Sequence, residues 1–321
     1  MNNIAALQVT EGDLAGSRKL FKEALAIGQE IGADTAVATA LVNLGDVGLQ
    51  LGDPAGSKAA YEEALAAFRK TGEKGKTSYP LVGLGDVFSA TGDLSAGKSN
   101  YEQGLAVSRE SGEKHQSAVA LAGLGTVQMR QGDLAGARKS YEEALALHRE
   151  LGEKDSEMDD QLLLARLAIE EGHAQEGETI LYGLVQVPVT ERVALARAVL
   201  AESLAVQGKV AEAQKQIGSA MALVRKTQRP AVQLDVQVAA ARVRMASGHP
   251  GDLRNAATAL NGVLAEAKKI GLADPQMQAR LTLATIEKKS GKGTAQLEAL
   301  EKDATARGFG LIARKAAKAR D

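Results

Sequence analysis

The stretch at residues 52–72, GDPAGSKAAYEEALAAFRKTG, decides the fold, because it returns three more times at a constant distance. The related stretches begin at Gly12, Gly92 and Gly132, so the period is 40 residues. Each copy starts with Gly-Asp and ends with Gly, and an aromatic residue follows nine positions after the first Gly. These aromatic residues are Phe21, Tyr61, Tyr101 and Tyr141. A repeat of this length is typical of a solenoid, in which similar units stack in one direction.

Each unit reads as two antiparallel helices. Leu41, Leu44 and Leu51 recur on one helical face before the Gly-Asp pair. Asp53 is then a good N-cap for the second helix, and Gly72 is a good C-terminal stop. Because one such pair cannot bury both of its faces, neighbouring pairs must stack. The sequence therefore predicts an all-α solenoid of stacked helix pairs.

Glycine recurs inside the first helix of three units, at Gly45, Gly85 and Gly125. A glycine in a helix interior costs up to about 1 kcal/mol relative to alanine. Its recurrence at one register predicts that a neighbouring helix passes too close for a side chain.

The second half of the chain keeps the rhythm less strictly. Its glycines follow Gly132 at intervals of 40, 36, 40 and 43 residues, at Gly172, Gly208, Gly248 and Gly291. We expect a regular array over residues 1–182 with a truncated first helix, a bend at 183–190, drifted helix pairs over 191–306, and a capping segment over 307–321. Pro80 predicts that the first helix of its unit starts late.

Composition excludes several classes of function. Thirty-nine Lys and Arg residues balance forty Asp and Glu residues, so the net charge of −1 gives no reason to expect nucleic acid. The absence of Cys excludes disulfides and thiolate metal sites. No stretch approaches the ~18 apolar residues of a membrane span, and the first residues do not resemble a signal peptide. We expect a cytoplasmic protein without a membrane partner.

Residues 92–99, GDLSAGKS, formally match the P-loop pattern of nucleotide-binding proteins. A P-loop follows a buried strand, whereas these residues follow a predicted helix. The same octet in other units reads GDPAGSKA and GDLAGARK, which indicates repeat sequence that drifted onto the pattern. We expect no nucleotide, no other cofactor and no catalytic residues, and we do not expect an enzyme.

The remaining polar groups suggest no chemistry. The histidines His115, His148, His173 and His249 are too far apart for a pair of helical metal ligands, so no metal is expected and all four are interpreted as solvated or turn residues. Glu62-Glu63 and Glu142-Glu143 recur at one register, which favours a solvated outer face. The basic residues near the C-terminus either attract an acidic partner or are solvated cations at a helix end. They are Arg307, Arg314, Lys315, Lys318 and Arg320.

The repeat resembles the tetratricopeptide repeat (TPR). Leu44-Gly45 in the first helix, followed by Tyr61 and Ala64 in the second, fits the pattern of that family. The long period is similar to the extended variety of kinesin light chains and bacterial signalling proteins. The resemblance implies a right-handed superhelix, whose concave face is lined by the first helices and binds peptides.

The family geometry further implies that the residue after the mid-helix glycine faces the concave groove. This position and its neighbours give the expected peptide-binding residues, which are Asp46, Leu49, Tyr79, Asp86, Thr126, Met129, Arg166, Glu202 and Arg242. Asp46 and Asp86 would form an acidic step, and Arg166 and Arg242 a basic zone. In the alternative interpretation, these charges only solvate a wide groove.

Two functions remain open at this point. The first is a non-catalytic scaffold that binds a peptide or protein partner in its groove. The second is the sensor or docking tail of a larger bacterial signalling or transcription regulator. It is suggested by the alignment of Asn3-Ile4-Ala5 with Asn43-Leu44-Gly45, which leaves the first helix without its opening turn. The partner and the oligomeric state are not predicted.

Overall fold

The computed structural model describes residues 2–187, 191–289 and 291–321, and within these residues it is helical without any β-strand. Residues 188–190, part of the expected bend at 183–190, lie outside the described residues. The first helices of successive pairs are α1 (Asn2–Glu11), α3 (Asp34–Gln50), α5 (Ser78–Thr91), α7 (Lys114–Gln131), α9 (Lys154–Glu170), α11 (Glu191–Val206), α13 (Pro230–Ser247) and α15 (Ala273–Lys288). The second helices are α2 (Leu14–Glu30), α4 (Pro54–Thr71), α6 (Leu94–Ser111), α8 (Leu134–Leu151), α10 (Ala174–Leu184), α12 (Val210–Leu223), α14 (Pro250–Lys269) and α16 (Thr294–Ala306). The described residues also form a last helix, α17 (Gly310–Arg320), and two short 3-10 helices, η1 (Lys74–Thr77) and η2 (Val224–Lys226).

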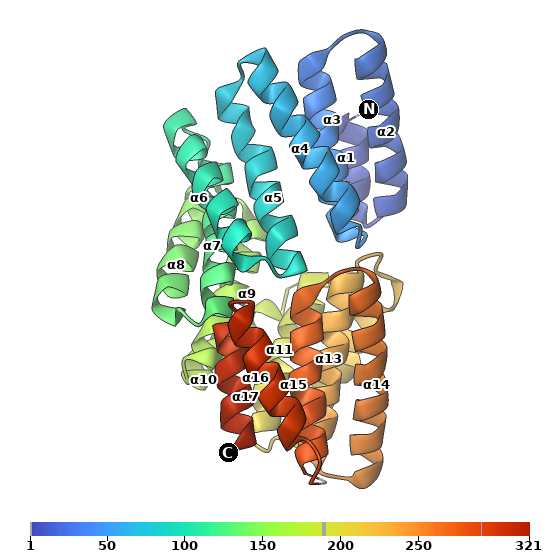
Figure 1. Cartoon of the computed structure of the whole chain (residues 1–321), viewed down its shortest axis with the longest axis vertical. Coiled ribbons are helices and arrows are strands. Elements are labelled where there is room, and N and C mark those ends of the chain that lie inside the picture. The colour runs from blue at the N-terminus through green and yellow to red at the C-terminus, as the bar shows by residue number, and fades with distance from the viewer. Residues whose placement is uncertain (1, 188–190, 290) are drawn as a thin grey trace.

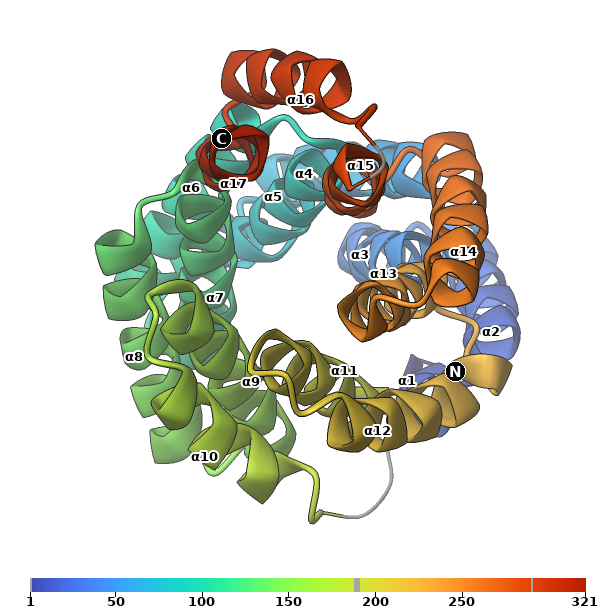
Figure 2. The same cartoon turned by 90° about the horizontal axis from the view of Figure 1, so that it is seen from below.

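The helix pairs wind into a right-handed superhelix (Figure 1). Seen along the superhelix axis, α3, α5, α7, α9, α11, α13 and α15 lie on the inner side, and the second helices form the outer layer (Figure 2). The predicted all-α solenoid of stacked pairs is confirmed. No described helix is both long enough and apolar enough to cross a membrane.

The Gly-Asp sequences determine where the second helices begin. The carboxylates of Asp13, Asp53, Asp93 and Asp133 accept a hydrogen bond from the backbone N–H three residues later, at 2.9–3.0 Å. Each carboxylate thus satisfies one of the N–H groups that a helix start leaves unpaired. The preceding glycines have positive φ, for example 79° at Gly52, which is a conformation that favours glycine. We call these four corners the Gly-Asp turns.

The predicted late start of the helix at Pro80 is confirmed. The period of 40 residues from Asp34, where α3 begins, would place this start at residue 74. Instead η1 occupies residues 74–77, and α5 begins at Ser78. Pro80 then lies in the first turn of α5, where its missing N–H breaks no helical hydrogen bond.

A tyrosine ring, rather than a neighbouring helix, accounts for the mid-helix glycines. A Cβ atom on Gly45 would lie 2.5 Å from the ring of Tyr61, and one on Gly83 would lie 2.4 Å from the same ring. Tyr101 is enclosed by Gly85 and Gly123 in the same way. The expectation that a helix passes there is therefore wrong. The glycines make room for a side chain of the second helix that crosses between two first helices.

The C-terminal helices rest on the Gly-Asp turns of the N-terminal ones. The N–H of Ala15 donates to Gln228 Oε1 at 2.9 Å. Pro230 and Ile270 pack at Gly52 in the next turn. Arg307 donates to the carbonyl of Thr91 at 3.4 Å, and Arg314 donates to that of Gly132 at 2.9 Å. One apolar cluster joins the N-terminal helices to the C-terminal ones, because Leu94 and Tyr101 belong to it together with Met277 and Phe309. After one turn of the superhelix, the C-terminal helices thus pack against the N-terminal ones, and we call this contact the closure.

The basic residues near the C-terminus take part in this closure. Besides Arg307 and Arg314, Lys315 forms an ion pair with Glu170 of α9 at 2.5 Å. Arg320 pairs with Glu301 of α16 at 2.6 Å, and Lys318 is exposed. Three of the five residues therefore bind distant parts of this chain.

Candidate functional site

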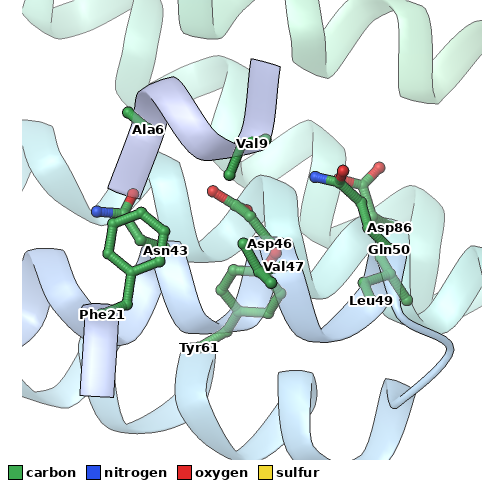
Figure 3. A pocket seen from close by; sticks show the side chains of 10 residues that line it. All are labelled: Ala6, Val9, Phe21, Asn43, Asp46, Val47, Leu49, Gln50, Tyr61 and Asp86. Atoms are coloured by element: carbon green, nitrogen blue, oxygen red, sulfur yellow. The ribbon is translucent and has the colours of Figure 1, made fainter. Parts of the chain in front are cut away.

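A cavity of about 360 Å³ lies on the inner side of the first two helix pairs (Figure 3). Its lining residues come mainly from α1 and α3, and they are Ala6, Val9, Phe21, Asn43, Asp46, Val47, Leu49, Gln50, Tyr61 and Asp86. Three of the residues predicted to bind peptide, Asp46, Leu49 and Asp86, are thereby brought together.

Tyrosine hydroxyl groups hold the two carboxylates of this cavity. The Tyr61 ring crosses the wall between Gly45 and Gly83, and its hydroxyl donates to Asp46 Oδ1 at 2.6 Å. Tyr101 donates to Asp86 Oδ1 at the same distance. Each carboxylate keeps its second oxygen for another donor. The carboxylates are therefore fixed in position before a ligand arrives.

The next unit repeats this arrangement without a charge. There the hydroxyls of Tyr141 and Thr126 lie 3.2 Å apart. The tyrosine–aspartate pair is therefore not repeated in the third unit.

The surrounding protein makes both carboxyl groups weaker acids. Loss of solvation raises the pKa of Asp46 to about 6, although the hydrogen bond from Tyr61 opposes the shift. Loss of solvation also raises the pKa of Asp86 to about 7, and the hydrogen bond from Tyr101 opposes this shift. Asp46 further raises the pKa of Asp86, and Arg130 lowers it. Asp86 is half-buried, whereas Asp46 is more exposed to water in the cavity.

Two amides lie beside the carboxylates, and sequence reasoning missed them. Asn43 and Gln50 stand three residues before and four after Asp46, so they share its helical face. This spacing in the sequence could have identified both amides as neighbours of Asp46. The Oε1 atom of Gln50 is buried and has no hydrogen-bond partner among the described residues. The cavity lining thus contains a buried acceptor without a partner beside the two carboxylates.

The expected basic zone lies elsewhere and is partly neutralised. Arg242 pairs with Glu202 at 2.9 Å and also donates to Thr282 at 3.1 Å. The Nε atom of Arg166 is buried without a hydrogen-bond partner in the described chain. Burial raises the pKa of Asp235 to about 6, and the positive charge of Arg166 opposes that shift. These residues do not line the cavity.

The other two predicted residues are also outside the cavity. Tyr79 packs against the apolar cluster around Tyr61 and donates weakly to Glu113 at 3.4 Å. Met129 packs against the cluster around Tyr141.

The P-loop-like octet forms no phosphate cradle. Gly92 ends α5, and the carboxylate of Asp93 accepts the backbone N–H of Ala96 at 3.0 Å. A negative group thus occupies the helix start where a P-loop would hold phosphate. Lys98 lies 3.9 Å from Glu102 on the surface of α6.

The interpretation of the histidines as solvated or turn residues is wrong for His148. This side chain is 3% exposed, and its Nδ1 lies 2.6 Å from Asp160 Oδ2. It also comes close to His115 and Glu153, which belong to other elements. The test for a pair within one helix could not find a cluster whose histidines are 33 residues apart.

Comparisons with known proteins agree with this architecture. A Rap protein complexed with competence and sporulation factor has a TM-score of 0.63 and 12% identity, covering 85% of this chain and 76% of that one. The Rap conjugation gene regulator of plasmid pLS20, in complex with the Phr* peptide, has a TM-score of 0.62 and 11% identity over 85% and 77%. A signal transduction ATPase with numerous domains (STAND) and a TPR sensor, from Pyrococcus horikoshii, has a TM-score of 0.58 and 12% identity. This match covers 100% of the present chain but 49% of that protein, so the chain spans about half of it.

At these identities the structural likeness shows the fold alone. No curated protein sequence matches the chain significantly. The family described as the MalT-like TPR region matches residues 4–304, which is nearly the whole of the 321 residues. With the 40-residue helix pairs and the superhelix, this match places the chain in the family of MalT-like TPR regions.

Proposed function

We propose that this chain is a non-catalytic peptide-binding module, and that its cavity holds a positively charged group of the peptide between Asp46 and Asp86. The observation that carries the proposal is the pair of carboxylates on successive first helices, each held by a tyrosine hydroxyl at 2.6 Å. A lysine, an arginine or a free N-terminal amine would form charge-assisted hydrogen bonds with them.

The remaining lining suits the rest of such a ligand. Ligand cavities are commonly about 300–1,000 Å³ and mostly apolar, with a few placed polar groups. Val9, Phe21 and Leu49 supply apolar surface for an aliphatic stem. Two Rap structures of the same fold contain the Phr* peptide or the competence and sporulation factor, which supports a peptide as the class of ligand.

The experiment selects peptides from a randomised displayed library with the wild-type chain. We expect enrichment of peptides that carry Lys, Arg or an unblocked N-terminus. The affinity of a selected peptide is then measured by fluorescence anisotropy for an Asp46→Asn, Asp86→Asn double variant. Loss of the two charges should weaken binding more than tenfold, because charge-assisted bonds are the strong ones.

The matched control is a Glu62→Gln, Glu63→Gln double variant, which removes two charges from exposed positions on the outer face of α4. It should bind like the wild type, and circular dichroism should show equal helicity for all three proteins. Equal affinities of the wild type and the Asn variant would disprove the role of the carboxylates.

The pH dependence of binding provides a second test. With pKa values of about 6 and 7, Asp46 and Asp86 are mostly charged at pH 8 and mostly neutral at pH 5. Peptide affinity should therefore fall as the pH drops from 8 to 5. The Asn double variant should lack this dependence. A wild-type affinity that rises on acidification would contradict the proposal.

A second candidate function is the sensor part of a larger regulator. It is favoured by the match to the STAND protein, whose TPR-containing structure covers 100% of this chain. The mass of the protein captured from its native cells separates the two. A mass near 33.4 kDa would refute the larger regulator, whereas a heavier polypeptide containing this sequence would support it.

A further inference from the structure

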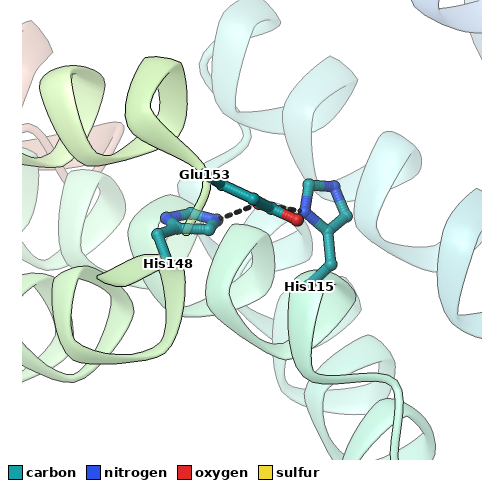
Figure 4. A group of neighbouring side chains, drawn as sticks. All are labelled: His115, His148 and Glu153. Carbon is teal, nitrogen blue, oxygen red and sulfur yellow. Dashed lines mark hydrogen bonds and ion pairs between the residues drawn. The ribbon is translucent and has the colours of Figure 1, made fainter. Parts of the chain in front are cut away.

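His115, His148 and Glu153 meet at a junction of three helices, apart from the cavity (Figure 4). His115 lies in the first turn of α7, His148 in the last turn of α8, and Glu153 is the residue before α9. One ligand atom from each residue lies within 4.8 Å of the other two. Imidazole nitrogen and carboxylate oxygen are the donors that zinc sites with an open position use.

Asp160 fixes the orientation of His148. The Nδ1 atom of His148 lies 2.6 Å from Asp160 Oδ2, and the two residues are 3% and 1% exposed. A carboxylate accepts from the N–H of an imidazole, so it directs the proton to Nδ1 and the free lone pair to Nε2. Metal-binding histidines almost always have such a partner behind them.

The Nε2 atom of His148 is buried and has no hydrogen-bond partner in the described chain. It lies 3.8 Å from Glu153 Oε2, too far for a hydrogen bond. Two acceptors therefore face each other across a gap, and a donor or a cation between them would satisfy both.

Small shifts of the side chains would make room for a bound ion. Glu153 Oε2 lies 2.7 Å from His115 Nδ1 and 3.8 Å from His148 Nε2. A tetrahedral ion with bonds of about 2.1 Å separates its ligand atoms by roughly 3.4 Å, so binding would lengthen the first distance, which is now that of a hydrogen bond, and shorten the second.

We propose that His115, His148 and Glu153 bind a divalent transition-metal ion, with Asp160 as the positioning residue behind His148. Two imidazoles and one carboxylate fit zinc best, with water in the fourth position. His115 is 48% exposed, so the site is open to solvent. The ion would join α7 to the turn between α8 and α9.

The test uses the full, untagged chain after removal of metal with a chelator. Zinc is titrated against a chromophoric chelator at pH 7.5, and cobalt is added in parallel because its visible absorption reports four-coordinate geometry. We expect one ion per chain and strong cobalt bands. The exposed position of His115 makes His115→Gln a variant that keeps the fold, and it should weaken zinc binding at least tenfold.

Two further variants separate the site from surface binding. Asp160→Asn should weaken zinc binding about 10–100-fold, as expected for a partner of a metal-ligating histidine. His173→Gln is the control, because His173 is 63% exposed and lies 3.8 and 3.7 Å from Glu171 and Glu176 without a buried second histidine. This variant should bind zinc like the wild type.

The alternative is that a proton on His148 provides the positive charge. In that case zinc would bind with no defined stoichiometry, or His115→Gln and His173→Gln would have the same small effect. Either result would overturn the proposal. The peptide assay is independent of this outcome, because none of these residues lines the cavity.

Discussion

Tyr61 passes through the wall of the superhelix because glycines flank its ring on both sides. The ring is 1% exposed, yet its hydroxyl reaches Asp46 on the inner face. A side chain of an outer helix thus contributes to the inner surface. The two glycines lower the helix propensity of α3 and α5 by up to about 1 kcal/mol each, and the close packing of the ring compensates for this loss.

Gly83→Ala tests this packing. The new methyl group would lie 2.4 Å from the rigid ring of Tyr61. Overpacking of this kind costs about 1–3 kcal/mol, which exceeds the gain of up to about 1 kcal/mol in helix propensity. We expect a lower melting temperature. Gly218→Ala in α12 is the control, because nothing lies within 4 Å of its Cβ position, and it should raise the melting temperature. Two shifts of the same sign would contradict this account.

The repeat pattern in the sequence identified residues with a structural role, but it did not always identify the residues that they contact. The glycine pattern identified Gly45, yet only the structure shows that a tyrosine fills the space. Asp46 and Asp86 occupy the same register in successive units, and both line the cavity. His148 was misread because its partners Asp160 and His115 lie on other helices, and spacing along the chain carries no information on such contacts.

At the level of helices, capping by the Gly-Asp turns explains why the N-terminal units were predicted so closely. The aspartates cap α2, α4, α6 and α8 in the same way. Later second helices begin without a side-chain cap, for example at Lys209 before α12. Their starts could not be assigned from a cap in the sequence.

Asp133→Ala should destabilise the start of α8. It removes the hydrogen bond to the N–H of Gly136, and loss of such a cap costs about 1 kcal/mol. Hydrogen exchange measured by mass spectrometry should therefore speed up in the first turn of α8. Lys209→Ala before α12 is the control and should leave exchange unchanged there, since this N-cap makes no side-chain bond. Unchanged exchange in α8 of the first variant would rule out the capping role.

Across the whole molecule, the closure distinguishes this chain from an open solenoid. The hydrogen bond from Arg307 joins residues 216 positions apart, and that from Arg314 joins residues 182 apart. Repeat periodicity predicts contacts between neighbouring units. It does not predict this closure, because the position of the last helices depends on small rotations that add up along the array.

Gly310→Ala should loosen the closure. Its Cβ atom would lie 2.3 Å from the backbone carbonyl oxygen of Gln131, at the end of α7, so α17 must move away. We expect a cost of about 1–3 kcal/mol, a larger radius of gyration in small-angle X-ray scattering, and faster hydrogen exchange around residue 131. Gly251→Ala in the first turn of α14 has open space around its Cβ and serves as the control. Identical scattering from both variants would show that the contact between α17 and the end of α7 tolerates the added methyl group.

The seating of the C-terminal helices on successive Gly-Asp turns also restricts how the gene for this chain can change in length. Tandem repeats are readily duplicated or deleted, and an open array accommodates this because each unit meets only its neighbours. Here, deletion of one 40-residue unit would place every later helix opposite the wrong turn, so that Arg314 would no longer reach Gly132. The contacts between the C-terminal helices and the Gly-Asp turns therefore fix the number of repeat units.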